Sequence, residues 1–313
     1  MAILTTTDRV SPIPSSLLSR VGGTPLIRLD RLTAALPSGV EVFAKAEWMN
    51  PSGSVKDRPA ALILSRALED GSLADGRTLL DSTSGNMGIA YASFAAALGL
   101  QVHLAIPSNA SPERIAVLRA LGADLTLTDP TEGSDGARAV AAEMAAQEPS
   151  RFFYADQYSH PANWQAHFHT TGPEVAEQTE GRITHFVAGL GTTGTLTGTG
   201  RYLRQVVPGV RIIGVQPATP LHGLEGLKHL ATSPVPSIFD PTIPDEMIEI
   251  ETEQAHEMAR RAAREEGLLI GVSAAAAAAA ALQLAARLEH ATVVALFPDS
   301  GLKYLGQDFW SRG

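Results

Sequence analysis

Short apolar runs alternate with longer segments of helical periodicity along this chain. The short runs predict strands at 41–45, 78–81, 101–106, 124–128, 152–155, 184–188, 210–215 and 292–297. Apolar spacing of three or four residues, or a high alanine content, predicts helices at 58–69, 135–147, 163–178, 194–206, 252–266 and 274–281. Buried strands that alternate with helices are typical of parallel sheets covered on both faces. The pattern therefore predicts an α/β fold, mostly parallel and doubly wound.

Composition excludes several kinds of chemistry. The 313 residues include no cysteine, which rules out disulfides, thiolate metal sites, iron–sulfur clusters and a catalytic thiol. Asp and Glu (33) outnumber Lys and Arg (24), and this acidic balance argues against broad binding to nucleic acid or anionic membranes. The chain shows no secretory signal, and its most apolar long stretch, 274–286, is shorter than the ~20 residues of a spanning helix. We expect a soluble, cytoplasmic protein.

Three turns rich in Gly, Ser and Thr each begin a helix. They are Ser82–Gly88, Gly189–Thr195 and Gly271–Ser273, and the first two directly follow predicted strands. In open parallel sheets, ligands bind beyond the carboxyl ends of the strands. One such turn would favour simple helix capping, but three in register favour a ligand site.

The second turn matches the dinucleotide pattern G-x-G-x-x-G at Gly189, Gly191 and Gly194. That fingerprint also needs an acidic residue at the end of the next strand, where this chain has Gln216-Pro217. The missing acid argues against a nicotinamide cofactor. The amides and hydroxyls that remain at a helix N-terminus are suited to a single phosphate.

Lys56 lies in the segment Asn50–Pro59, after a strand and a turn and before a helix. A helix N-terminus and burial both lower the pKa of a lysine toward nucleophilic values. It is not a P-loop lysine, because G-x-x-x-x-G-K-[ST] is absent. The local sequence leaves an ordinary surface lysine as the alternative.

Together these segments resemble the fold-type-II pyridoxal-phosphate enzymes, and within them the cysteine synthase and cystathionine β-synthase family. The matching segments occur in family order over nearly the whole chain, at 23–26, 50–59, 82–88, 189–198, 271–273, 298–301 and 304–305. Residues 184–204 look most like cysteine synthases of the actinobacterial type, some of which use O-phosphoserine. The resemblance implies two doubly wound, three-layer α/β domains: a small mobile one at 46–152, and a large one of 1–45 and 153–313.

The resemblance also implies roles for individual residues around bound pyridoxal 5′-phosphate. Lys56 matches the lysine that forms the Schiff base, Asn86 the partner of the 3′-oxygen, and Ser273 the hydroxyl that faces the pyridine nitrogen. The phosphate cup matches Gly191, Thr192, Thr193, Gly194 and Thr195. The positions that hold the substrate carboxylate match Thr83, Ser84, Met87 and Gln157. Met87 replaces the family's usual threonine, so only its backbone N–H could serve there.

The implied activity is β-replacement on an activated L-serine. O-acetylserine or O-phosphoserine would react with sulfide or a sulfur-carrier protein to give L-cysteine through an aminoacrylate. A hydroxyl at the pyridine nitrogen makes the ring a weaker electron sink, which suits elimination better than transamination. An amine nucleophile giving a diaminopropionate-type product, another sulfur nucleophile, and serine or threonine dehydration are the alternatives. A homodimer is the assembly that the resemblance implies.

Residues 217–244 are rich in proline and carry little periodic structure, which favours a lid or binding loop. Within this segment Lys228 matches the region where phosphoserine-using relatives carry a phosphate-binding arginine. We therefore expect Lys228, with His222, to bind an anionic leaving group, or else to be a solvated loop charge. His160, His167 and His169 could suggest a metal site, but His-x-His on a helix points the rings apart, so we expect polar packing and no metal.

Overall fold

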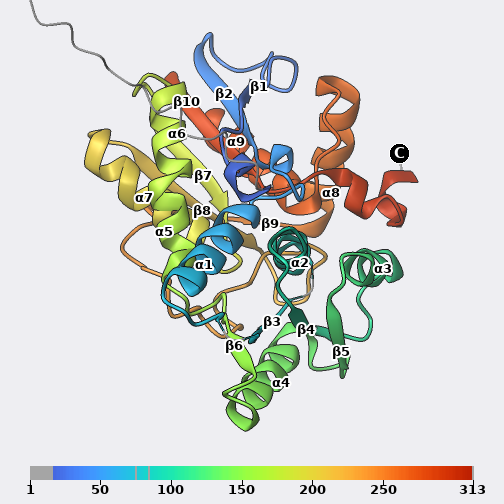
Figure 1. The fold of residues 1–313 in the computed structure, drawn as a ribbon. Coiled ribbons are helices and arrows are strands. Elements are labelled where there is room, and N and C mark those ends of the chain that lie inside the picture. Colours follow the sequence, from blue (N-terminus) through green and yellow to red (C-terminus); the bar gives the residue numbers. More distant parts are fainter. Residues whose placement is uncertain (1–16, 75, 84, 312–313) are drawn as a thin grey trace, which may run out of the picture.

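The computed structural model describes residues 17–74, 76–83 and 85–311. It contains a six-stranded and a four-stranded β-sheet, each with helices on both faces (Figure 1). All neighbouring strands run parallel except β1, which is antiparallel to β2. The prediction of a mostly parallel, doubly wound α/β fold is therefore confirmed.

The six-stranded sheet brings together strands from both ends of the sequence. Its order is β1 (Leu26–Arg28), β2 (Gly39–Ala46), β10 (His290–Phe297), β7 (His185–Gly189), β8 (Arg211–Pro217) and β9 (Glu246–Ile250). One face is covered by α8 (Thr252–Arg261) and α9 (Val272–Ala285), and the other by α6 (Thr171–Gln178) and α7 (Gly194–Val206). The helix α5 (Ala162–His169) packs on α6 and α7. Two separate cores result, one on each face.

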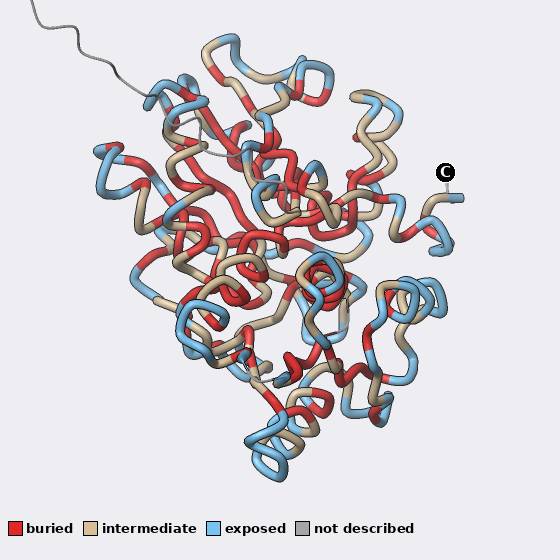
Figure 2. Tube along the Cα trace, viewed as in Figure 1, coloured by how far each residue is buried: buried red, intermediate tan, exposed pale blue. Residues whose placement is uncertain are grey.

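Alternation along β10 shows how the sheet divides these cores. Val293 and Ala295 pack with α8 and α9, whereas Val294 and Leu296 pack with α6 and α7. Because successive side chains of a strand point to opposite faces, a strand buried on both sides must be apolar at every position. This is why residues 293–297 of β10 read as a continuous apolar run, and Figure 2 shows the strand among the buried ones.

The alanine run of residues 274–281 forms the buried centre of α9. Every alanine in it is buried, and the helix contacts α8 on one side and β10 and β7 on the other. Side chains of one carbon allow the helix to approach both neighbours closely, so the predicted buried helix is confirmed. A larger residue in this run would overpack the core.

The four-stranded sheet is built from one continuous stretch of chain. Its order is β5 (Asp124–Thr128), β4 (Val102–Pro107), β3 (Thr78–Ser82) and β6 (Phe152–Tyr154). Its helices are α1 (Asp57–Glu69), α2 (Asn86–Leu98), α3 (Pro112–Ala120) and α4 (Gly133–Gln147). α4 packs on one face, at the bottom of Figure 1, while α2 and α3 pack on the other. The short 3₁₀ turns of the fold are Leu17–Arg20, Glu47–Met49, Gly301–Tyr304 and Asp308–Ser311.

Four local expectations differ from the structure. The helix expected over 163–178 is two helices separated at Thr170, and the one expected over 252–266 is α8 followed by a π-helical turn, Ala262–Glu266. Strands β1 and β9 were not expected. Both are edge strands with partly exposed residues, so neither carries the apolar run of a central strand. The segment between β8 and β9 forms neither helix nor strand, as the proline-rich composition predicts.

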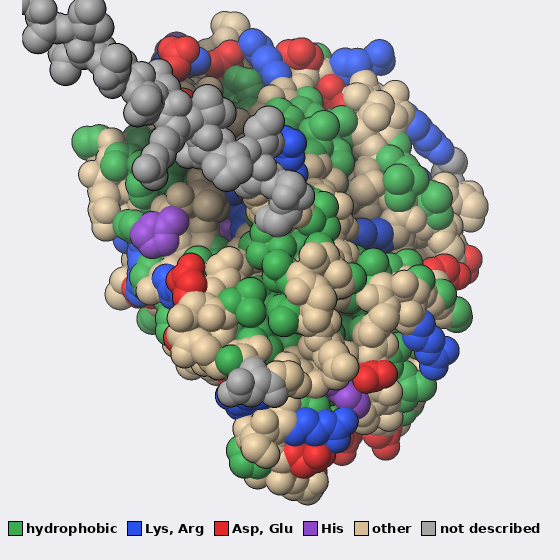
Figure 3. Space-filling view, viewed as in Figure 1, with side chains coloured by type: hydrophobic (Ala, Val, Ile, Leu, Met, Phe, Trp, Pro, Cys, Tyr) green, Lys and Arg blue, Asp and Glu red, His purple; other side chains and the backbone are tan. Residues whose placement is uncertain are grey.

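Charges on the face drawn in Figure 3 are distributed toward its edges, with acidic and basic side chains interspersed. No broad basic surface is visible on that face. Of the helices within the described ranges, none has the length and apolarity needed to cross a bilayer.

Four ionised side chains form a cluster inside the protein, which we call the buried ion cluster: Lys45, Glu47, Arg58 and Glu174. Arg58 Nε lies 2.7 Å from Glu47 Oε2, and its Nη1 lies 2.7 Å from Glu174 Oε1. Lys45 Nζ lies 2.6 Å from Glu174 Oε2. Arg58 and Glu47 are fully buried, so each charge depends on its partners for compensation. The cluster ties β2 and α1 to α6.

The buried ion cluster predicts a specific acid sensitivity. Burial would raise the pKa of Glu174, but the hydrogen bonds and charge of Arg58, together with Lys45, outweigh it and lower that pKa to about 2 from 4.5. Because the pKa is lower in the folded state, this stabilisation is present above pH 4.5 and is lost as the pH falls toward 2. We expect the melting temperature of Glu174→Gln, measured by thermal unfolding at a series of pH values, to change less between pH 4.5 and 2 than that of the wild type. Parallel plots of melting temperature against pH for the two proteins would contradict the assignment.

Candidate active site

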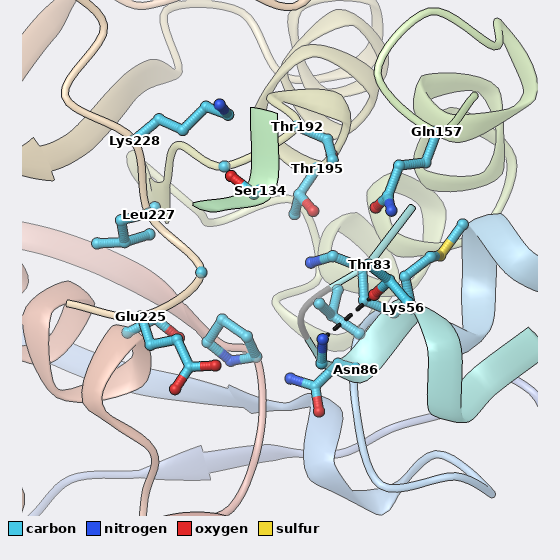
Figure 4. A pocket seen from close by; sticks show the side chains of 18 of the residues that line it. Lys56, Thr83, Asn86, Ser134, Gln157, Thr192, Thr195, Glu225, Leu227 and Lys228 are labelled. Carbon is cyan, nitrogen blue, oxygen red and sulfur yellow. Dashed lines mark hydrogen bonds between the residues drawn. The ribbon is translucent and has the colours of Figure 1, made fainter. Parts of the chain in front are cut away.

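A cavity lies at the carboxyl ends of strands from both sheets, where the predicted turns converge (Figure 4). The predicted residues on its wall are Lys56, Thr83, Asn86, Met87, Gln157, Gly191, Thr192, Thr193, Thr195, Lys228 and Ser273. Gly194 begins α7 directly behind the wall, and Ser84 lies outside the described residues. Residues from distant parts of the chain therefore share one cavity.

Lys56 reaches the cavity from the turn that precedes α1. The N–H of Val55 donates to the carbonyl of Pro298 at 2.8 Å, which ties this turn to the end of β10. Enclosure by protein lowers the pKa of Lys56, the nearby Asp299 opposes this, and the charge of Lys303 lowers it further. A larger share of Lys56 is therefore the neutral amine, the form that acts as a nucleophile or base.

The segment Gly191–Thr195 leaves β7 and enters α7 with very little free space. A Cβ on Gly191 would lie 2.3 Å from the carbonyl oxygen of Gly226, and one on Gly194 would lie 2.0 Å from Asn163 Oδ1. Thr193 adopts a left-handed conformation (φ 69°), and its buried hydroxyl has no partner within the described protein. Backbone amides, an unpaired hydroxyl and the positive end of α7 together form an anion site.

Two buried side chains from α5 hold this segment from behind. Asn163 Nδ2 donates to the carbonyl of Gln157 at 2.7 Å and to Thr192 Oγ1 at 3.1 Å. His167 Nε2 lies 3.2 Å from Thr195 Oγ1, and burial lowers the pKa of His167 to about 3, so the ring is neutral at pH 7. α5 thereby connects the anion site to the segment that carries Gln157.

Thr83 caps the start of α2. Its hydroxyl accepts hydrogen bonds from the N–H groups of Gly85 (3.2 Å) and Gly88 (3.1 Å). Gln157 Nε2 donates to the carbonyl of Ser82 at 2.8 Å. The side chain of Met87 is buried in the core of the four-stranded sheet, which leaves its backbone as the part able to meet a substrate.

Ser273 and Asn86 each stand at the start of a helix facing the cavity. Ser273 is the second residue of α9 and presents a hydroxyl, while Asn86 is the first residue of α2. The Asn86 amide is held by Asp299 and by Lys303, both beyond β10. Asp299 lies in one of the segments that match the family, but nothing in the local sequence indicates that Asp299 or Lys303 holds the Asn86 amide.

Two ion pairs connect the segment between β8 and β9 with helices of the four-stranded sheet, across the cavity. Arg114 of α3 pairs with Glu225, with Nη2 to Oε2 at 2.9 Å. Lys228 Nζ lies 3.2 Å from Asp135 Oδ1 of α4, and its side chain is only 12% exposed. Lys228 therefore lies on the cavity wall, although a carboxylate already accompanies it. Arg114 and Glu225 were not expected, because their partners are far away in sequence.

The family described as pyridoxal-phosphate dependent enzyme matches residues 17–299. The chain therefore belongs to the pyridoxal-phosphate dependent enzyme family, and its cofactor is pyridoxal phosphate.

The chain is also similar to individual proteins over nearly its whole length. The chain is 50% identical over 295 residues to the cysteine synthase of Aquifex aeolicus, covering 93% of this chain and 90% of that one. The crystal structure of a cysteine synthase from Entamoeba histolytica superposes with a TM-score of 0.91 at 33% identity, over 100% of this chain and 95% of that one. An O-ureido-L-serine synthase structure gives a TM-score of 0.88 at 36% identity, over 96% of both chains.

The residues present fit this cofactor. The anion site at Gly191–Thr195 carries the unpaired Thr193 hydroxyl that a phosphate would satisfy. Lys56 supplies an enclosed amine, and Ser273 supplies a hydroxyl on the same cavity wall. The chain has only four lysines, at positions 45, 56, 228 and 303, and Lys56 is the one that immediately follows the family-like Asn50–Val55 segment.

Proposed function

We propose that the protein makes L-cysteine by β-replacement, joining an activated L-serine to sulfide or to a sulfur carrier. The observation that carries the proposal is the convergence of Lys56, the anion site and Ser273 on one cavity. The similarity to proteins named cysteine synthase over nearly the whole chain supports the same activity.

Each part of the cavity would take one part of the cofactor. Lys56 would hold its aldehyde carbon, the Gly191–Thr195 segment its phosphate, Ser273 its ring nitrogen and Asn86 its 3′-oxygen. When bound, pyridoxal phosphate withdraws electrons from the α-carbon of an amino acid, which makes loss of the α-proton and of a β-leaving group feasible. The uncharged Ser273 hydroxyl does not force a proton onto the ring nitrogen, which suits β-replacement.

The protein's own groups bind the substrate and move its proton. Thr83, Gln157 and the backbone N–H of Met87 would hold the substrate carboxylate, which orients the α-carbon toward Lys56. Lys56 Nζ, whose pKa is lowered by enclosure, would accept the α-proton and return it to the product. The ion pair Arg114–Glu225 would limit water at the cavity during the reaction.

Product analysis tests this proposal directly. Purified protein loaded with pyridoxal phosphate is incubated with O-acetylserine or O-phosphoserine and sulfide, and the products are identified by mass spectrometry. Cysteine is the expected product. Protein that binds the cofactor but forms no cysteine from either donor would contradict the proposal.

A second candidate uses another nucleophile. The solved structure titled O-ureido-L-serine synthase is 36% identical over 96% of this chain, so a closely similar scaffold carries a name other than cysteine synthase. An amine nucleophile, giving a diaminopropionate-type product, would use the same Lys56 chemistry. Parallel incubations with amine donors separate the two candidates, since the product that forms at the higher kcat/KM identifies the nucleophile.

Lys228 is proposed to contact an anionic leaving group such as phosphate. If O-phosphoserine displaces Asp135 from Lys228, then Lys228→Ala removes a charge-assisted contact and kcat/KM for O-phosphoserine falls by roughly 10-fold or more. The value for O-acetylserine, whose leaving group is uncharged before departure, changes much less. Lys228→Arg is the matched variant and retains the phosphoserine activity. Equal effects on both donors, or none on O-phosphoserine, would contradict the role and the proposed likeness to the actinobacterial type.

The assembly and domain division are proposed on the same resemblance. Residues 46–152 would form a small mobile domain around the four-stranded sheet, and 1–45 with 153–313 a large domain that anchors the phosphate. A homodimer, a sulfur-carrier partner and a cytoplasmic location complete the proposal. Light scattering on the purified protein measures the assembly.

A further inference from the structure

Asn86 is the centre of a small polar cluster that the proposed chemistry does not explain. The cluster consists of Asn86 together with Asp299, Lys303 and Tyr304, and we call it the Asn86 cluster. Lys303 Nζ donates to Asn86 Oδ1 at 2.6 Å and to the carbonyl of Gly53 at 3.2 Å. Asn86 Nδ2 donates to Asp299 Oδ2 at 2.8 Å, and the Tyr304 hydroxyl donates to the same oxygen at 2.9 Å.

The two partners of the Asn86 amide allow only one orientation. An ammonium group can only donate a hydrogen bond, and a carboxylate can only accept one. Lys303 must therefore face the amide oxygen, and Asp299 must face the amide nitrogen. With Oδ1 engaged by Lys303 and one N–H by Asp299, the second N–H of Asn86 is the group left for a ligand in the cavity.

The position of Lys303 in the fold allows it to contact both Asn86 and Gly53. It lies on the 3₁₀ turn Gly301–Tyr304, while its ammonium bridges the start of α2 and the loop that leads to Lys56. Asp299, Asp57 and Arg114 are the other charged groups that act on it, and Lys303 acts in turn on Lys56. Lys303 is partly buried, which costs its ammonium group solvation, so its hydrogen bonds and the nearby negative charge of Asp299 must compensate.

We propose that Lys303 is a positioning residue that holds the Asn86 carbonyl oxygen away from the cavity and so keeps an amide N–H directed at the 3′-oxygen of the cofactor. The proposal rests on the proposed function, which assigns that oxygen to Asn86. Lys303 does not touch the substrate. It acts through Asn86 and through its positive charge beside Lys56.

The test compares Lys303→Met, which has similar length and no donor, with Lys303→Arg, which can only donate. Lys303→Met leaves Asn86 Oδ1 without a donor, and we expect the affinity for pyridoxal phosphate to fall by roughly 10-fold. The visible absorption band of the cofactor on Lys56 should titrate at higher pH, because a nearby positive charge has been removed. Lys303→Arg should restore most of both properties. Leu302→Ala, on the same turn but 66% exposed, is the matched control and should change neither.

A double-mutant cycle separates positioning from simple stabilisation. In an Asn86→Ala background, Lys303→Met should have little further effect on cofactor affinity, since the contact through which it acts is gone. Equal losses in both backgrounds, or an unchanged titration in Lys303→Met, would overturn the proposal. A wild-type protein that takes up no cofactor would instead overturn the proposed function, so the two failures are distinguishable. Circular dichroism spectra of Lys303→Met and Lys303→Arg are compared to show whether Lys303→Met is folded.

Discussion

Lys56→Ala is expected to lower kcat by at least roughly 10³-fold, because the variant loses both the covalent attachment point and the proton carrier. The anion site at Gly191–Thr195 does not depend on Lys56, so the variant should still bind pyridoxal phosphate without a covalent bond. Borohydride reduction followed by peptide mass mapping measures the attachment. In the wild type, the reduced cofactor should be found on the peptide that contains Lys56, and in Lys56→Ala on no peptide.

The lysine content of the chain makes this experiment unambiguous. The other lysines that could carry the label are Lys45, Lys228 and Lys303. Lys45 is committed to Glu174, and Lys228 to Asp135. Lys228→Ala is the control and should keep the label on Lys56. A label on any other lysine, or near-normal turnover by Lys56→Ala, would contradict the assignment.

Arg58→Met is expected to lower the free energy of unfolding by about 3–5 kcal/mol. Arg58 and Glu47 are fully buried, so loss of the guanidinium leaves the Glu47 carboxylate without its main compensating charge. Glu174 keeps Lys45 as a partner and is affected less. Urea unfolding of the protein, monitored by circular dichroism, measures the change. The denaturant slope should remain constant if the variant keeps the native fold.

Arg28→Met is the matched control for this prediction. Arg28 also pairs with two carboxylates, Asp30 and Glu41, but its side chain is 54% exposed. Water screens such pairs, so the expected change is below about 1 kcal/mol. If Arg58→Met were as mild as Arg28→Met, the buried ion cluster would not contribute to stability in the way its geometry indicates.

Much of the site follows from local sequence because its parts are local structures. The turn Gly191–Thr195 needs glycines where Gly226 and Asn163 approach, and this requirement is visible as a pattern of glycines after an apolar run. The strands β10 and β7 are apolar at successive positions because both their faces are covered. Hydrophobic periodicity and turn composition report such short-range requirements directly.

The supporting contacts could not be predicted in the same way. Lys303 and Asn86 are 217 positions apart, and Arg114 and Glu225 are 111 apart. A charged residue is usually solvated, and nothing beside it in sequence tells whether a fold will enclose it or which partner it will meet. The edge strand β9 shows the same limit, because whether one or both of its faces are covered depends on distant helices, and here Ile248 and Ile250 are buried while Met247 and Glu249 are exposed.

The sequence by itself therefore determined the α/β class, the alternation of the central strands with helices, and the three turns that face the cavity, because each is encoded within a few residues. The tertiary structure alone decided that Lys56 is enclosed, that Lys303 orients Asn86, and that Arg58 lies buried between two carboxylates. Burial and the direction of hydrogen bonds both depend on segments far apart in the chain meeting in space, which local periodicity does not encode.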